Sequence, residues 1–126
     1  MSKPKPTEAE LAILQVLWRH GPCTVRQVHE ELCKDKPSGY TTTLKLLQIM
    51  TGKKLVRRDE SQRTHIYRAA LREEETQRNL VDDLLQRAFG GSAQKLVMQA
   101  LAHKKATPDE LAEIRKLLDE LEGGAK

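Results

Sequence analysis

Aromatic residues are scarce in this 126-residue chain, which has one tryptophan, two tyrosines and one phenylalanine. Proteins that bind single-stranded nucleic acids stack bases on aromatic side chains, so this composition argues against that class of ligand. Long apolar runs are also missing, and none approaches the roughly 20 residues that span a bilayer. The N-terminus passes from basic to acidic residues without the apolar segment of a secretory signal. We therefore expect a cytoplasmic protein without membrane insertion.

Cysteine occurs only as Cys23 and Cys33, a spacing that matches neither a disulfide framework nor a CxxC metal pair. Both are expected to be reduced, partly buried thiols. The segment VHEELC at 28–33 resembles the helical zinc-protease motif, but Cys33 stands where the second histidine belongs, and no third ligand follows at a suitable spacing. A metal or redox site at His29, Glu30 and Cys33 is kept as an alternative. The main prediction is no catalytic residue, no metal and no cofactor.

Positive charge is concentrated in the first part of the chain. Residues 1–70 contain 13 lysines and arginines against 7 acidic residues, whereas residues 71–126 contain 9 against 11. A basic front half and a mildly acidic back half suggest that only the front half meets a polyanion. Solvated lysines on a stable domain would give a similar excess, so charge alone leaves both explanations open.

Two capping boxes predict the first two helices. Thr7 with Glu10 precedes an apolar-rich stretch that Gly21 and Pro22 end, and Thr24 with Gln27 precedes a shorter helix. The break at residues 36–39, KPSG, ends the second helix. The sequence therefore begins with a pair of short helices.

Residues 40–50, YTTTLKLLQIM, predict a third helix with two distinct faces. One face carries Thr43, Leu47 and Met50, and the other carries Thr41, Lys45 and Gln48. Threonine is a mediocre helix former, but at a helix entrance its hydroxyl can cap backbone N–H groups or reach outward. We expect the run of hydroxyls to do both.

A basic hairpin is predicted after the third helix. Alternating residues at 55–58 and 64–69 indicate two strands around a polar turn at 59–63. Three short helices followed by such a hairpin are the pattern of a winged helix-turn-helix, in which hairpin and third helix lie on one side of the domain.

Only helices are predicted after residue 70. Their apolar stripes exceed what some fifty residues can bury alone, so we expect a homodimer interface. The predicted interface residues are Leu80, Val81, Leu84, Leu85, Phe89, Leu96, Val97, Leu111, Ile114 and Leu118. The predicted organisation is a tail at 1–6, a winged-helix domain at 7–70 and a three-helix dimerisation domain at 71–126. The fold class is mainly α with a small β-hairpin.

The predicted site is a surface that binds double-stranded DNA. The base-reading candidates on the third helix, placed in the major groove, are Thr41, Thr42, Lys45 and Gln48. The candidates for contacts with the DNA backbone are Tyr40, Lys53, Lys54, Arg57 and Arg63, of which Lys53 and Arg63 are the principal ones. Arg58 and Arg68 belong to the same basic surround.

Four stretches resemble the penicillinase-repressor family, the BlaI/MecI/CopY group of bacterial transcriptional repressors. They are PTEAELAILQVLW at 6–18, TVRQVHEEL at 24–32, YTTTLKLLQIM at 40–50 and RTHIYRA at 63–69. The likeness continues through AFGGS at 88–92 and the final capped helix, and so covers nearly the whole chain.

The resemblance implies a dimeric repressor that binds an inverted-repeat operator and blocks promoters, commonly those of β-lactamase or altered penicillin-binding-protein genes. It also implies induction by proteolysis inside the dimerisation domain, triggered by a membrane sensor metallopeptidase. Ala88 and Phe89 match the cleavage region of the family.

Three departures from the family pattern stand out. Ile49 replaces a residue that is often basic, Lys54 replaces a usual glycine, and the C-terminus lacks the cysteine-rich tail of the copper-responsive branch. A lysine with positive φ at position 54 would be mildly strained. Ile49 keeps open an alternative function, that of a winged-helix adaptor that binds proteins and has little sequence-specific affinity for DNA.

Overall fold

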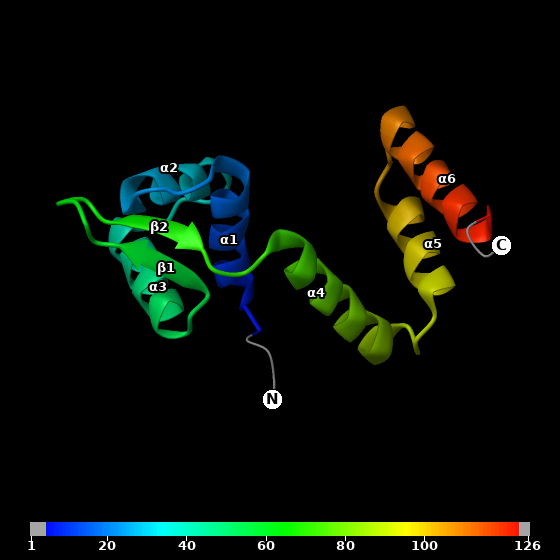
Figure 1. The fold of residues 1–126 in the computed structure, drawn as a ribbon, viewed down its shortest axis with the longest axis horizontal. Helices are drawn as coiled ribbons and strands as arrows, with labels where there is room; N and C mark the ends of the chain where they lie inside the picture. The colour runs from blue at the N-terminus through cyan, green and yellow to red at the C-terminus, as the bar shows by residue number, and fades with distance from the viewer. Residues whose placement is uncertain (1–4, 124–126) are drawn as a thin grey trace. The chain divides into compact units, whose positions relative to one another are not determined.

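The computed structural model describes residues 5–123 as six helices and one hairpin (Figure 1). The elements in chain order are α1 (Glu8–His20), α2 (Val25–Asp35), α3 (Tyr40–Gly52), β1 (Val56–Asp59), β2 (Ile66–Ala69), α4 (Glu73–Ala88), α5 (Ala93–His103) and α6 (Pro108–Gly123). The first five elements form a winged helix-turn-helix and the last three are helices, so the predicted fold class is confirmed.

The first two helices begin at the predicted capping boxes. The Thr7 Oγ1 atom accepts a hydrogen bond from the Glu10 amide at 3.2 Å, and the Glu10 carboxylate accepts one from the Thr7 amide at 2.9 Å. Thr24 and Gln27 form the same reciprocal pair ahead of α2. Helix α1 ends at Gly21, whose φ of 79° is open to glycine at little cost. Local sequence thus sets both helix starts and the end of α1.

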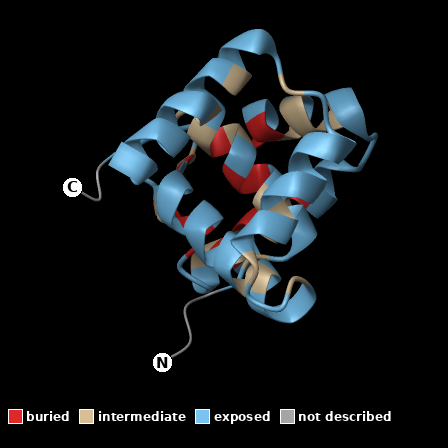
Figure 2. Ribbon diagram, turned by 90° about the vertical axis from the view of Figure 1, so that its right-hand side faces the viewer, coloured by how far each residue is buried: buried red, intermediate tan, exposed pale blue. Residues whose placement is uncertain are grey.

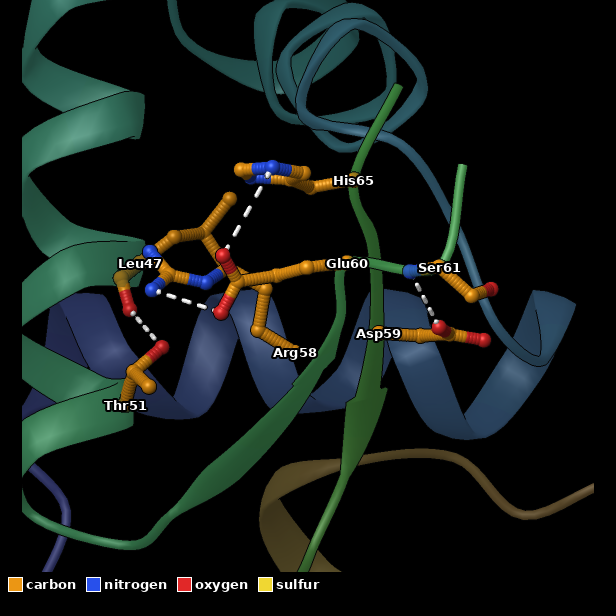
Figure 3. A network of polar contacts seen from close by, with 7 residues as sticks. All are labelled: Leu47, Thr51, Arg58, Asp59, Glu60, Ser61 and His65. Carbon is orange, nitrogen blue, oxygen red and sulfur yellow. Dashed lines mark hydrogen bonds and ion pairs between the residues drawn. The ribbon is translucent and has the colours of Figure 1, made fainter. Parts of the chain in front are cut away.

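The hairpin is shifted from its predicted position. The antiparallel register pairs Val56 with Ala69 and Asp59 with Ile66, so the connecting loop is 60–65 instead of 59–63. Leu55 lies outside β1 because its amide donates to the Met50 carbonyl, and its side chain is fully buried. The Asp59 carboxylate accepts the Ser61 amide at 2.9 Å at the start of this loop, which begins one residue later and ends two residues later than predicted (Figure 3).

The segment between α1 and α2 also pairs with the hairpin, which the sequence did not predict. Cys23 and Tyr67 exchange two backbone hydrogen bonds, of 2.9 and 2.7 Å, in an isolated antiparallel bridge. Both side chains are buried. This bridge attaches β2 to the helix-turn-helix, while β1 packs on α3.

One apolar core holds the winged helix together, and its residues are red in Figure 2. It consists of Ile13, Leu14, Leu17, Cys23, Val25, Val28, Leu47, Met50, Leu55, Val56 and Tyr67. The Trp18 indole N–H donates to the Leu71 carbonyl at 2.9 Å, which ties the chain after β2 to α1. Burial of these side chains is the main source of stability for this part of the chain.

The chain divides into two compact units, Met1–Arg78 and Asn79–Lys126. The boundary falls within α4, whose first turn belongs to the first unit: Thr76 is buried and its hydroxyl donates to the Arg72 carbonyl at 2.8 Å. The division at residue 70 that the sequence suggests lies slightly earlier, and as a statement about independent domains it stays a prediction.

The second unit contains well-capped helices without a buried residue among those that the structure describes. The Ser92 hydroxyl caps α5, and Thr107 with Glu110 forms a third capping box ahead of α6. Gly90 and Gly91 both have positive φ after α4, as a helix end requires. The local structure of this unit is therefore fixed by its sequence, whereas its apolar faces remain open.

Lys54 has a φ of 66°, the one positive φ outside glycine among residues 5–123. Replacing it with glycine should raise the free energy of unfolding by about 1 kcal/mol, because the strain of a side chain in this region exceeds the entropic cost of glycine. Urea unfolding of Lys54→Gly and Lys54→Ala measures this effect. Alanine removes the same charge but keeps the β-carbon, so an equal gain for both variants would contradict the argument.

Candidate nucleic-acid interface

Helix α3 presents a polar strip to solvent. Thr43, Leu47 and Met50 are buried in the core, and the opposite side carries the predicted base-reading residues, all exposed or half-buried: Thr41, Thr42, Lys45 and Gln48. The two faces are those that helical spacing predicts. An exposed strip of hydroxyl, ammonium and amide groups on one helix is suited to base edges in a major groove. The reading of bases by these residues stays a prediction.

The threonines of α3 do not cap the helix, contrary to the prediction. Gly39 is the N-cap, and no side chain accepts a hydrogen bond from the first turn. The helix begins at Tyr40, so Thr41 and Thr42 already lie inside it and cannot occupy the capping position. Thr43 turns inward instead, with its Oγ1 atom 3.1 Å from His29 Nδ1. A later threonine, Thr51, donates to the Leu47 carbonyl at 2.8 Å (Figure 3).

The hairpin carries exposed arginines, of which Arg57 and Arg63 have no ion-pair partner in the described chain. Arg57 and Arg68 lie directly opposite each other in the register, and Arg63 is in the loop. Like charges opposite each other destabilise a hairpin, and the Asp59 carboxylate offsets part of this repulsion because it interacts with Arg68. Within residues 5–123 we find no carboxylate at ion-pair distance from Arg57 or Arg63. Both are therefore available to an anionic ligand.

Arg58, in contrast, is engaged within the protein. Figure 3 shows its guanidinium facing Glu60, with a distance of 3.1 Å from Nη2 to Oε2. His65 lies on the other side of the same carboxylate at 3.9 Å. A hydrogen bond with Tyr67 raises the pKa of Arg58 most, and the hydrogen bond and negative charge of Glu60 raise it further. The loop thus engages one arginine with its own acidic residue and leaves Arg63 exposed.

Lys53 has a structural partner that the sequence did not reveal. Its Nζ atom lies 2.9 Å from Oε2 of Glu10, whose side chain is 2% exposed. Burial alone would raise the pKa of Glu10, but the hydrogen bonds from Lys53 and the Thr7 backbone outweigh it, so this pKa lies below its ordinary value. Lys53 is itself 47% exposed, so a DNA contact stays a prediction beside this structural role.

A groove of about 430 Å³ lies between the start of α2, the start of α3 and the hairpin. Its lining consists of Thr24, Val25, Arg26, Tyr40, Leu44, Arg63, Thr64, His65 and Tyr67. Arginines and hydroxyl-bearing residues from separate elements make its rim suitable for an anion. The sequence predicted Tyr40 and Arg63 but missed Arg26 and Thr24, because only the tertiary structure brings α2 beside the hairpin.

The alternative metal or redox site does not assemble as a cluster of ligands. Cys33 Sγ lies 3.5 Å from His29 Nε2, while Glu30 is exposed. Among the described residues there is no group of three or more potential metal-binding side chains. Both cysteines are free thiols, and burial raises the pKa of Cys23. In the same part of the chain, no helix is long and apolar enough to cross a membrane.

The predicted dimer residues lie on α4, α5 and α6 and are exposed or half-buried. Val81, Leu84, Val97 and Leu118 are each exposed by more than two fifths. Met98 is exposed as well and was not predicted. Ala88 is the last residue of α4, and Phe89 follows it immediately before two glycines. Neither the interface nor cleavage at this point is tested by these observations, and both stay predictions.

The sequence model described as "Penicillinase repressor" matches residues 6–120. The chain belongs to the penicillinase repressor family. Its relatives include the transcriptional regulator BlaI of Mycobacterium tuberculosis, 37% identical, with 93% of this chain and 85% of that protein covered. The penicillinase repressor of Staphylococcus aureus is 20% identical, over 90% of each chain. The resemblance seen in the sequence is confirmed.

Two solved structures resemble this member of the penicillinase repressor family. The solution structure of the DNA-binding domain of the repressor BlaI has a TM-score of 0.52 at 25% identity and covers 60% of this chain and 93% of that one. A MarR family protein from Bacillus stearothermophilus has a TM-score of 0.50 at 19% identity and covers 94% of this chain and 74% of that one. The second likeness shows the shared fold alone. Family membership indicates a repressor and not an enzyme.

Proposed function

We propose that this protein is a homodimeric transcriptional repressor that binds an inverted-repeat operator in duplex DNA. The observation that carries the proposal is the polar strip Thr41, Thr42, Lys45 and Gln48, held outward by a helix whose other face is in the core. A rigid helix that presents polar groups on one side is the common means of reading a major groove. Membership of the penicillinase repressor family supports the same function.

The hairpin and the groove supply the contacts to the DNA backbone. Arg57 and Arg63 lack ion-pair partners in the described chain, and Arg63 lines the groove together with Tyr40 at the start of α3. Phosphates would further relieve the repulsion between Arg57 and Arg68, which Asp59 offsets in part, and would add affinity without sequence information. Lys53 and Lys54 flank this surface as further backbone contacts.

Dimerisation is proposed from the exposed apolar faces of the second unit. Helices α4 to α6 leave several leucines and valines open, and a symmetric pair of chains is the simplest way to cover them. A dimer places two copies of α3 on two half-sites, so the operator would have dyad symmetry. We propose a cytoplasmic protein, because its ligand is the bacterial chromosome.

Induction is proposed to follow proteolysis near Ala88 and Phe89. Helix α4 ends there, and the two following glycines with positive φ form a connection without regular secondary structure. Cleavage would separate the apolar face of α4 from those of α5 and α6 and so reduce the dimer interface. A sensor metallopeptidase or a protease that it activates is the proposed partner, and genes for β-lactam resistance are the proposed targets.

Selection of random duplex DNA by the purified protein tests the proposal. We expect an enriched inverted repeat whose half-site centres lie about one or two helical turns apart. An adaptor that binds proteins is the second candidate, favoured by Ile49, which is 41% exposed on α3 where a polar contact would be expected. Binding without sequence enrichment, abolished by raised salt, would support the adaptor and contradict the repressor.

Lys45→Ala and Arg63→Ala should affect DNA binding in different ways. Loss of Lys45 should reduce discrimination at one base pair of each half-site by about 1–3 kcal/mol, whereas loss of Arg63 should weaken all duplexes alike and lower the salt slope by about one for each bound phosphate. Binding of the selected operator and a scrambled duplex at several salt concentrations measures both. Identical profiles for the two variants would contradict the division between reading helix and hairpin.

A further inference from the structure

The first turn of α3 is held in place by a neighbouring helix and not by its own cap. Gly39 offers no side chain, and the described capping contacts are backbone bonds from the Thr42 and Thr43 amides to the Gly39 carbonyl. Thr41 and Thr42, two of the four proposed base-reading residues, lie in this turn. Their position therefore depends on whatever fixes the residues beside them.

His29 of α2 contacts the residues on both sides of this threonine pair. Its Nδ1 atom lies 3.1 Å from Oγ1 of Thr43, which is 1% exposed. Its ring meets the Tyr40 ring edge-on, with centroids 5.5 Å apart and planes at 76°. Such edge-to-face pairs are favourable, and a buried hydroxyl is costly to leave without a partner. The two contacts hold Tyr40, immediately before Thr41, and Thr43, immediately after Thr42.

Cys33, one turn further along α2, also contacts the histidine ring. The Sγ atom lies 3.5 Å from His29 Nε2, 3.8 Å from His29 Nδ1 and 3.6 Å from the Ser38 carbonyl oxygen, so it links the ring to the chain that leads into α3. The Thr43 hydroxyl can either donate or accept, so its bond to His29 forms in either neutral tautomer. Thr43, Tyr40 and Cys33 thus all contact the His29 ring, and these contacts restrict its orientation.

We propose that His29 is a positioning residue for sequence recognition, which sets the pose of Thr41 and Thr42 through Thr43 and Tyr40. This inference rests on the proposed DNA-binding function. It assigns a part in specificity to a residue that is not among the proposed DNA contacts. The distinction from ordinary packing is testable, because a packing defect would weaken binding to every duplex, whereas a displaced reading turn weakens the operator alone.

The test compares four variants of the full-length protein, each with one substitution: His29→Leu, His29→Phe, His29→Asn or Thr43→Val. Leucine removes both contacts, phenylalanine keeps the ring contact, and asparagine keeps a hydrogen-bonding group. Valine removes the Thr43 hydroxyl at nearly constant volume, and Thr43→Ser, which restores a hydroxyl, is its control. Each variant is first checked by thermal unfolding, and affinities are compared on the selected operator and a scrambled duplex.

For His29→Leu and Thr43→Val we expect operator affinity to fall about tenfold, as the loss of one hydrogen bond suggests. The affinity for the scrambled duplex and the salt dependence of binding should stay unchanged. Asparagine and phenylalanine should each recover part of the loss, and Thr43→Ser most of it. Equal losses on both duplexes, or full specificity in a folded His29→Leu protein, would overturn the inference.

Amide hydrogen exchange without DNA separates this inference from the proposed function. Exchange at Thr42, Thr43 and Leu44 should accelerate in His29→Leu and in Thr43→Val, while the amides of the later turns of α3 keep their protection. If no operator is enriched but exchange accelerates, the proposed function fails and the support by His29 stands. If the operator is found and exchange is unchanged, the positioning role is refuted while the repressor function remains.

Discussion

Leu84→Asp will convert the repressor to a monomer and lower its affinity for the inverted repeat by about 100-fold or more. Leu84 is 46% exposed on α4, in the middle of the apolar face that we assign to the dimer. A charge there would have to be buried without a partner, which opposes association. The loss in DNA affinity follows because linking two half-site contacts raises affinity by roughly 10²–10⁴ over one.

Analytical ultracentrifugation and operator binding measure the two parts of this prediction. The matched control is Gln86→Asp, which adds the same charge to the same helix at an exposed polar position. Neither residue belongs to the core of the winged helix, so far-ultraviolet circular dichroism should show folded protein in both cases. A Leu84→Asp protein that sediments as a dimer would refute the proposed interface.

Lys53→Met will destabilise the winged helix by about 2 kcal/mol at neutral pH. The substitution leaves the buried Glu10 carboxylate without its cation while keeping most of the apolar stem. Charged hydrogen bonds contribute roughly 1.5–3 kcal/mol, and the half-exposed lysine places the expected cost toward the middle of that range. Urea unfolding measures the effect, and Lys45→Met, at an exposed position of α3, is the control.

The same pair predicts how stability depends on pH. Because the folded protein lowers the pKa of Glu10, its contribution is complete above the ordinary glutamate value of 4.5 and is lost as pH falls through the lowered folded value. The difference between the wild-type protein and Lys53→Met should therefore shrink below pH 4.5, since a protonated Glu10 needs no cation. A difference that stays constant across this range of pH would show that the ion pair contributes nothing.

The structural role of Lys53 affects how the operator binding of its variants should be interpreted. A weakened operator complex of a Lys53 variant reports on folding as well as on phosphate contact, so Arg63 is the better probe of the hairpin. Arg63 has no ion-pair partner in the described chain and lines the groove beside Tyr40. The sequence could rank the two cations only by their positions, whereas the structure separates them by their partners.

Local chemistry is enough to place most of the helix boundaries. Thr7 with Glu10 and Thr24 with Gln27 set two helix starts, and Gly21 sets an end, because a cap depends on residues three or four apart. The two faces of α3 follow from its 3.6-residue period in the same way. The positive φ of Lys54 is the strained conformation that the sequence analysis considered for this position.

The failures of prediction concern contacts between distant segments. The strand limits were wrong because Leu55 is held by α3 and the core, and the bridge from Cys23 to Tyr67 joins residues from separate elements. The prediction that the α3 threonines cap the helix was wrong, because the helix begins at Tyr40 and the buried Thr43 hydroxyl contacts His29. Neither the helical period of a sequence nor a capping motif contains information about contacts with distant segments.

The sequence by itself determined where the first two helices begin, which face of α3 is polar, and the family to which the chain belongs. These features depend on neighbours along the chain or on the pattern of the chain as a whole. The tertiary structure alone decided that Lys53 neutralises Glu10, that Arg26 and Arg63 line one groove, and that His29 contacts the first turn of α3. Each of these joins residues far apart in sequence, and only the packing of the core brings such side chains within reach of each other.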